Sequence, residues 1–180
     1  MRRADFDMLI EAVAATAEVR QVVVVGSQSI LASIPEDQLP REATLSPEID
    51  VVIAEHPRAG AVRQILGPGS LIDREHLVYV DVVSEATPHL PIHWDDRAVH
   101  YRTRPLGVIA VCPEIHDLAL AKLGAGRTDK DIPYLESLLE HVPPLLELDI
   151  LLARLPEMAG VISDPGFARS EAWIRSKRGR

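Results

Sequence analysis

The chain has 180 residues and a formal net charge of −8, with 47% hydrophobic and 26% charged residues. This balance is typical of a folded globular protein and excludes wholesale disorder, while the length favours one domain over two. No apolar run approaches the ~20 residues of a membrane helix, and acidic residues interrupt the N-terminal segment, so we expect no membrane contact and no signal peptide. A single cysteine, Cys112, excludes an internal disulfide and predicts a cytoplasmic location.

Charge is unevenly distributed along the chain. The segment from Ala168 to the C-terminus carries five basic residues and one acidic residue, which leaves a net charge of −12 on the rest. An acidic body disfavours general nucleic-acid binding, because Lys and Arg supply most of the non-specific affinity for phosphates. We expect residues 161–180 to form a basic, solvated and frayed tail, with a basic contact arm as the alternative.

Hydrophobic periodicity and the positions of Gly and Pro divide the chain into short elements. Helices are expected over residues 4–17, 28–32, 57–66, 113–123, 129–141 and 144–155. Strands are expected over residues 21–25, 48–53, 76–83, 99–103 and 108–112. The Pro-containing stretch 33–47 and the connection 84–97 are expected to be loops.

Strands therefore come first and a helical block comes last, which predicts the α+β class with a small mixed β-sheet, flanking helices and a helical C-terminal half. The chain divides into an α/β core over residues 1–112, a helical part over 113–160 packed on the same domain, and the tail.

Three acids lie within predicted strands. Side chains alternate across a strand, so Glu48 and Asp50 share one face, and Asp81 lies inside the next apolar strand. Burying a carboxylate is costly unless it is paired or binds a metal, and Mg²⁺ prefers carboxylate and phosphate oxygens. The acids therefore indicate a metal site. The alternative is a structural role, in which Glu48 caps a solvent-facing strand end and Asp81 pairs with an arginine such as Arg97 or Arg102.

Two further features favour a phosphate site. Gly26 and Ser27 end the first strand abruptly and turn into a helix, which offers backbone amides and a hydroxyl to a phosphate. Lys122 continues an apolar helical stripe inward and is followed by Arg127 and Lys130, so it is a candidate to hold a triphosphate. The alternative for Lys122 is an extended side chain that reaches solvent past the stripe.

These motifs form an ordered set: Gly26-Ser27, Pro47-Glu48-Ile49-Asp50, and residues 116–127 followed by Lys130-Asp131. The set resembles an uncharacterised bacterial nucleotidyltransferase family that is allied to the AbiEii-type toxins of type IV toxin–antitoxin systems. The Leu90-Pro91 and 94–97 segments match it as well, and the likeness runs from about Phe6 to about Leu155.

The resemblance implies a nucleotidyltransferase-like fold that acts on a nucleoside triphosphate (NTP) with Mg²⁺ or Mn²⁺. By position, Gly26, Ser27, Lys122, Arg127 and Asp131 would form the nucleotide site. Glu48 and Asp50 would be the metal pair, with Asp81 as a third acid inferred from strand alternation; these three and Lys122 are the candidate catalytic residues. Glu48 departs from the family pattern, which usually has Asp at this position.

Function is expected to be the transfer of a nucleoside monophosphate from NTP to a hydroxyl acceptor. The allied toxins add nucleotides to transfer RNA ends, so the resemblance suggests an RNA acceptor, a toxin role and a cognate antitoxin protein as partner. The alternative is a catalytically inactive domain of the same fold that binds a nucleotide or a protein.

Overall fold

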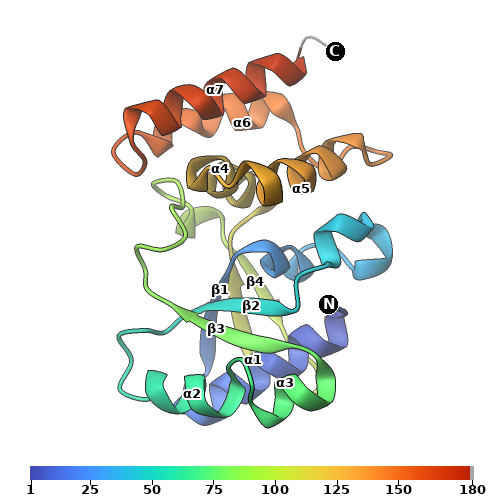
Figure 1. The fold of residues 1–180 in the computed structure, drawn as a ribbon, viewed down its shortest axis with the longest axis vertical. Coiled ribbons are helices and arrows are strands. Elements are labelled where there is room, and N and C mark those ends of the chain that lie inside the picture. Colours follow the sequence, from blue (N-terminus) through green and yellow to red (C-terminus); the bar gives the residue numbers. More distant parts are fainter. Residues whose placement is uncertain (179–180) are drawn as a thin grey trace.

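The computed structural model describes residues 1–178, which form a five-stranded mixed sheet with helices on both sides (Figure 1). The order of strands in the sheet is β3-β2-β1-β5-β4. The strands are β1 (Gln21–Val25), β2 (Glu48–Val52), β3 (Tyr79–Val83), β4 (Val99–Arg102) and β5 (Ile109–Cys112). β1 is antiparallel to β2 and parallel to β5, while β2 and β3 are parallel. All five expected strands and the mixed sheet are thus confirmed.

One side of the sheet carries the N-terminal helices, α1 (Arg3–Ala17), α2 (Ala59–Leu66) and α3 (Leu71–His76) (Figure 1). Phe6, Leu9, Ile10 and Val13 recur at helical intervals along α1 and are completely buried. This spacing places them on one stripe that faces the sheet, where the hydrophobic effect stabilises the contact.

The strand register assigns residues to the two faces of the sheet. Val25 lies opposite Asp50 and Val24 lies opposite Val51. Val24 and Val51 are buried against the N-terminal helices. The opposite face, which carries Asp50, is directed to the helical C-terminal half, so the predicted acids lie between the two halves of the molecule.

The C-terminal half consists of α4 (Ile115–Ala125), α5 (Thr128–Glu140), α6 (Leu148–Arg154) and α7 (Asp164–Arg178) (Figure 1). α7 packs on α4 and α6, and Ile174 and Ser170 are buried there. The expectation of a solvated, frayed tail is therefore wrong, because the basic residues of the tail lie on a helix whose other face carries Phe167 and Ile174 into the core. Arg180, the last basic residue of that tail, lies outside the described residues.

Several boundaries differ from the expectation. His76 belongs to α3, a six-residue helix that the expected strand 76–83 missed; Ser70 caps it by accepting a hydrogen bond from Asp73 N. The expected loop 33–47 contains two short 3₁₀ turns, Glu36–Gln38 and Arg41–Thr44. The predicted helix 144–155 begins later, at Leu148, because the Leu145 N–H donates to Leu138 O across a turn instead.

Within residues 1–178, no helix combines the length and the apolar character needed to cross a membrane.

Candidate functional site

The turn after β1 places the backbone of Gly26 against the carboxylate of Asp50. Gly26 has a φ of 72°, and a Cβ added to it would lie 1.8 Å from Oδ2 of Asp50. Glycine is therefore required twice, for the left-handed backbone and for the space that Asp50 occupies. The 3₁₀ turn Ser27–Ala32 follows immediately, so Ser27 comes directly after the glycine that contacts Asp50.

Two acids of β2 and one of β3 lie on the same face of the sheet. In the parallel register, Glu48 lies opposite Tyr79 and Asp50 lies opposite Asp81. Tyr79 donates its hydroxyl proton to Glu48 Oε2 at 2.7 Å. Among residues 1–178, Asp50 has no hydrogen-bonding or ionic partner, so its charge faces two other carboxylates without a protein cation in contact.

The electrostatics of the two β2 acids differ accordingly. Burial, with the negative charges of Glu48 and Asp81, raises the pKa of Asp50 to about 6. Burial also acts to raise the pKa of Glu48, but hydrogen bonds from Tyr79 and Lys130 outweigh it and lower that pKa. Asp50 is therefore the carboxylate that would gain most from a cation.

A buried lysine lies opposite the acids. Lys122 of α4 is 4% exposed, and its Nζ donates to Ser27 Oγ at 2.8 Å and to Asp131 Oδ1 at 2.9 Å. Arg127 Nε donates to the other oxygen of Asp131 at 3.0 Å. Burial lowers the pKa of Lys122, and the charge of Asp131 opposes that shift. Lys122 thus points inward, and the alternative of a side chain extended into solvent is wrong.

Two residues of α5 complete this arrangement. Lys130 Nζ lies 3.2 Å from Glu48 Oε1 and connects the helical half to β2. Tyr134 donates to the Ser27 carbonyl oxygen at 3.0 Å, and its ring lies under Lys122, with Nζ 4.1 Å from the ring centroid. The cation–π contact partly offsets the cost of burying the lysine.

These groups surround one cavity of about 270 Å³. Its polar wall has the acids Glu48 and Asp50 on the β2 side and the cations Lys122, Arg127 and Lys130 on the α4–α5 side. Gly26 and Ser27 of the turn after β1 also line it. The rest of the lining comes from the apolar residues Val83, Leu118 and Ala121 and from the mixed segment 87–90. A phosphate fits the cationic side of this cavity and a divalent cation fits the acidic side.

Residues 4–165 match the family described as "Nucleotidyltransferase of unknown function (DUF6036)". The chain belongs to this nucleotidyltransferase family. Comparison with curated proteins and with solved structures gives no match. The expected nucleotidyltransferase-like α+β fold is confirmed by the family and by the mixed sheet with its helical C-terminal half.

The structure of this nucleotidyltransferase brings most of the predicted site residues to one cavity. Asp131 lies behind that cavity, 1% exposed, where it holds Lys122 and Arg127. Asp81 lies beside Asp50 in the register but outside the cavity lining, and it is exposed on the edge strand β3. In the described part of the chain neither Arg97 nor Arg102 pairs with Asp81, since Arg97 binds Asp117 and Glu157.

Sequence reasoning did not assign a role to Tyr79 or Tyr134. Strand alternation was the available signal for Tyr79, which stands two residues before Asp81 and therefore on the same face. Helical spacing was the signal for Tyr134, three residues after Asp131. Both residues contact the site through their hydroxyl groups. A pattern of apolar positions does not show whether a tyrosine serves the core or a polar site.

The oxygen donors around Asp50 determine which metal ion the site can hold. In the described residues, no three His, Cys, Asp or Glu side chains are gathered closely enough to form a metal centre by themselves. Asp50 and Glu48 offer carboxylate oxygens and Ser27 a hydroxyl, which are the hard donors that Mg²⁺ and Mn²⁺ take. The donors therefore fit a divalent cation that takes its remaining ligands from phosphate and water.

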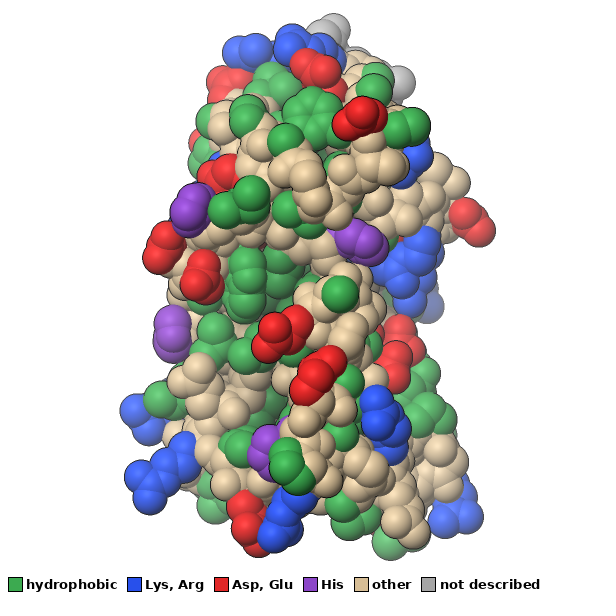
Figure 2. Space-filling view, turned by 90° about the vertical axis from the view of Figure 1, so that its left-hand side faces the viewer, with side chains coloured by type: hydrophobic (Ala, Val, Ile, Leu, Met, Phe, Trp, Pro, Cys, Tyr) green, Lys and Arg blue, Asp and Glu red, His purple; other side chains and the backbone are tan. Residues whose placement is uncertain are grey.

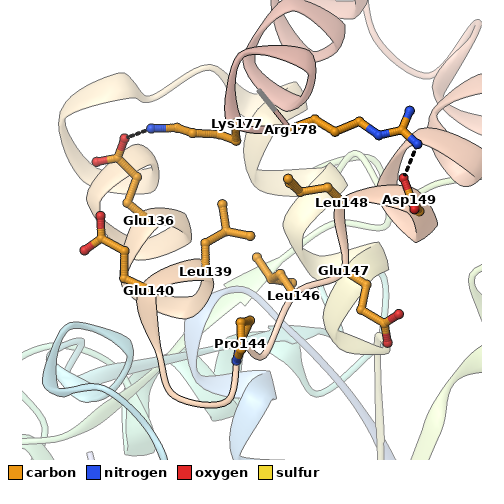
Figure 3. A pocket seen from close by; sticks show the side chains of 10 residues that line it. All are labelled: Glu136, Leu139, Glu140, Pro144, Leu146, Glu147, Leu148, Asp149, Lys177 and Arg178. Atoms are coloured by element: carbon orange, nitrogen blue, oxygen red, sulfur yellow. Dashed lines mark hydrogen bonds and ion pairs between the residues drawn. The ribbon is translucent and has the colours of Figure 1, made fainter. Parts of the chain in front are cut away.

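A larger groove of about 720 Å³ lies between α5, α6 and α7 in the nucleotidyltransferase (Figure 3). Leu139, Leu146 and Leu148 line it, and acidic side chains surround them. Its cations are already paired: Lys177 with Glu136, and Arg178 with Asp149 at 2.8 Å. This groove lacks a free cation among the described residues and is therefore a poor site for a triphosphate.

Proposed function

We propose that the protein transfers a nucleoside monophosphate from an NTP to a hydroxyl group, with the triphosphate bound in the cavity between β2 and α4. The observation that carries the proposal is the placement of Asp50. Its carboxylate has no protein partner in the described residues, faces Glu48 and Asp81, and lies across the cavity from Lys122 and Arg127.

The cations are proposed to hold the phosphates. Lys122 is already oriented by Asp131 and Ser27, so its ammonium group is fixed before a ligand arrives. Arg127 and Lys130 are half exposed and are able to turn toward an anion. Most of the rate enhancement then comes from positioning and from neutralising charge on the transferred phosphate.

The acids are proposed to hold Mg²⁺ or Mn²⁺ at Glu48 and Asp50, with Asp81 as the third acid of the site. When bound, the cation supplies charge neutralisation and activation of a hydroxyl group. Glu48 is oriented by Tyr79, and Asp50 by its contact with the Gly26 backbone. Asp81 adds negative charge next to Asp50 through the strand register.

Label transfer from purified NTPs tests this proposal. The full chain is incubated with each of the four labelled NTPs, Mg²⁺ or Mn²⁺, and two acceptor pools: total RNA and a small-molecule extract. Asp50→Asn is expected to abolish transfer. Asp37→Asn, which changes an exposed acid remote from the cavity, serves as control and is expected to keep it. Absence of transfer with every nucleotide and both pools contradicts the proposal.

The resemblance to AbiEii-type toxins belongs to this proposal as well. As an alternative to a small-molecule acceptor, it suggests a transfer RNA end, and with it growth arrest on expression, a cognate antitoxin protein and a cytoplasmic location, to which the free Cys112 is suited. Label transfer to total RNA tests the acceptor, and expression in cells with a measured growth rate tests the toxin role. Normal growth at high expression contradicts that role.

A second candidate function is an inactive nucleotide-binding domain. It is favoured by the engagement of Glu48, whose two oxygens accept from Tyr79 at 2.7 Å and from Lys130 at 3.2 Å. Calorimetry distinguishes the two functions. Nucleotide affinity that is independent of Mg²⁺ and unchanged in Asp50→Asn supports the inactive domain, whereas affinity that depends on both supports the enzyme.

A further inference from the structure

A second cavity lies beside the proposed nucleotide cavity. Its volume is about 620 Å³. Val25, Pro88, His89 and Leu90 line both cavities, so the segment 88–90 forms a common wall between them. Transfer between two substrates needs both to be held side by side with their reacting atoms in contact. The second cavity therefore lies where the acceptor of the transfer has to bind.

The floor of the second cavity lies on the same face of the sheet as Asp50. Val23 and Val52 form part of it. Val25 lies opposite Asp50 in the antiparallel register. Val23 is two residues before Val25 and Val52 is two residues after Asp50, so both share that face of the sheet. Two residues along a strand span about 6–7 Å. A group bound on this floor therefore lies next to the Asp50 carboxylate.

The charges that line the two cavities are opposite in character. The nucleotide cavity has Lys122, Arg127 and Lys130, while the described lining of the second cavity has no Lys or Arg but has Glu85 and Asp95. On the face that Figure 2 shows, hydrophobic and acidic side chains occupy the middle, histidines lie both there and at one edge, and most Lys and Arg side chains lie toward the edges. Nucleic acids bind mainly through Lys and Arg contacts to phosphates, so this lining disfavours a polyanion.

Rings line the second cavity as well. Trp94, His89 and His93 come from the connection between β3 and β4, together with Pro88 and Pro91. Flat aromatic and proline surfaces bind planar or apolar rings, and an indole face attracts a cation. With two carboxylates at the rim, this lining fits a ring-bearing molecule that is neutral or positively charged.

The wall of the cavity is held in place by the helical half. Arg97 binds the fully buried Asp117 through Nε at 2.9 Å and Glu157 through a terminal nitrogen at 2.7 Å. The Ile92 N–H donates to the Glu157 carbonyl oxygen at 3.2 Å. The connection 84–97 is thus fixed at its C-terminal end, and the cavity is formed before any ligand binds.

We propose that this second cavity binds the acceptor of the nucleotidyl transfer, and that the acceptor is a small hydroxyl compound with a planar or apolar ring and a neutral or positive charge, not a nucleic acid. The inference rests on the proposed function. The acceptor oxygen forms a bond to the α-phosphorus of the NTP, the bond from that phosphorus to the bridging oxygen breaks, pyrophosphate leaves, and the hydroxyl proton passes to solvent.

Two phenols of opposite charge test the class of ligand: tyramine and 4-hydroxyphenylacetate. Binding is followed by Trp94 fluorescence in the full chain carrying Trp173→Phe, which leaves Trp94 as the one tryptophan of the sequence. Trp173 Nε1 has no hydrogen-bond partner within residues 1–178, so this substitution removes no such bond. Tyramine is expected to bind at least about tenfold more tightly than 4-hydroxyphenylacetate, a difference of about 1.4 kcal/mol.

Paired variants locate the binding. Glu85→Gln combined with Asp95→Asn is expected to remove the preference for tyramine. Glu140→Gln combined with Glu147→Gln removes two acids from the distant groove of Figure 3 and is expected to keep it. Equal affinity for both phenols, tighter binding of 4-hydroxyphenylacetate, no quenching by either, or quenching of Trp94 by a short single-stranded RNA overturns the inference.

The fluorescence measurement needs neither NTP nor metal. A negative result for the acceptor class can therefore be told apart from a negative result for the proposed function. If the chain carrying only Trp173→Phe shows no preference for tyramine but keeps Mg²⁺-dependent NTP binding, only the acceptor class is refuted. Tyramine binding without any NTP binding refutes the enzyme and leaves a ligand cavity.

Discussion

Lys122 and Asp131 form an ion pair inside the protein, with Nζ 2.9 Å from Oδ1 and the two side chains 4% and 1% exposed. Removing one member of a buried pair leaves an uncompensated charge, at a typical cost of about 3–5 kcal/mol. Asp131→Asn is therefore expected to lower the free energy of unfolding by about 3 kcal/mol in urea denaturation.

Two further variants separate this pair from general effects on α5. Asp129→Asn, on the exposed first turn of the same helix, is expected to change stability by less than about 0.5 kcal/mol. Lys122→Met together with Asp131→Asn is expected to be more stable than Asp131→Asn alone, because no lone buried charge remains. A double variant that is less stable than the single one contradicts the ion-pair interpretation.

Asp50 is expected to make stability depend on pH. Its pKa is raised from 3.8 to about 6, so the ionised carboxylate destabilises the folded state. The penalty is absent well below pH 4, grows as the pH rises from about 4 to about 6 because the unfolded chain loses its proton first, and is constant at higher pH, where both states are ionised. Asp50→Asn is thus expected to stabilise the metal-free protein by about 1–2 kcal/mol at pH 7, after discounting for partial exposure, and to have no effect well below pH 4.

Thermal unfolding at several pH values checks that sign. Mg²⁺ is expected to raise the melting temperature of the unmodified protein at pH 7 and to leave that of Asp50→Asn unchanged, since the cation stabilises the state that binds it. Destabilisation by Asp50→Asn in metal-free buffer at pH 7 contradicts the assignment of a raised pKa.

Gly26 is expected to tolerate no side chain. Gly26→Ala places a Cβ 1.8 Å from Asp50 Oδ2 at a φ of 72°, so both the turn and the carboxylate must move. A loss of about 2–3 kcal/mol in unfolding free energy is expected, together with loss of Mg²⁺-dependent NTP binding. Gly60→Ala is the control: its Cβ meets nothing within 4 Å on α2, and stability is expected to rise by about 0.5–1 kcal/mol.

The last helix is expected to be part of the folded core. Ile174 on α7 is fully buried, and Ile174→Ala is expected to cost about 2–4 kcal/mol in urea denaturation. Arg175→Ala, which removes an exposed pair with Glu171, is expected to cost less than about 1 kcal/mol. Equal and small effects of the two substitutions would indicate that α7 does not contribute to stability.

The strands could be predicted because their sequences are unambiguous. Residues 21–25 contain four successive valines, which favour a strand, and the glycine that follows at position 26 marks where the strand ends. α3 was missed because it is short and both Leu71 and Leu77 at its ends are exposed, which leaves no amphipathic pattern to detect. α7 was expected as a solvated tail because its charge dominates its composition, while only a few apolar residues carry its packing.

The site was predictable to the extent that strand alternation fixes side-chain direction. Glu48 and Asp50 follow from the period of two, and the register places Asp81 beside Asp50 as expected. The contact of Lys122 with Ser27 was not predictable in detail, since it joins residues 95 positions apart through the packing of α4 on the turn after β1. The wall formed by residues 87–90 follows from the anchoring of Arg97, which no local pattern encodes.

The position of β1 at the middle of the sheet has a consequence for how the chain matures. Its neighbours are β2, which follows soon after in sequence, and β5, which begins only at Ile109. On the ribosome, a nascent chain that has reached β3 therefore presents the valine-rich β1 with one row of backbone amide and carbonyl groups unpaired. Such an unpaired strand edge is a template for association with other chains. Prematurely ended products that stop before Ile109 are expected to aggregate, and chains that extend past Cys112 close that edge themselves.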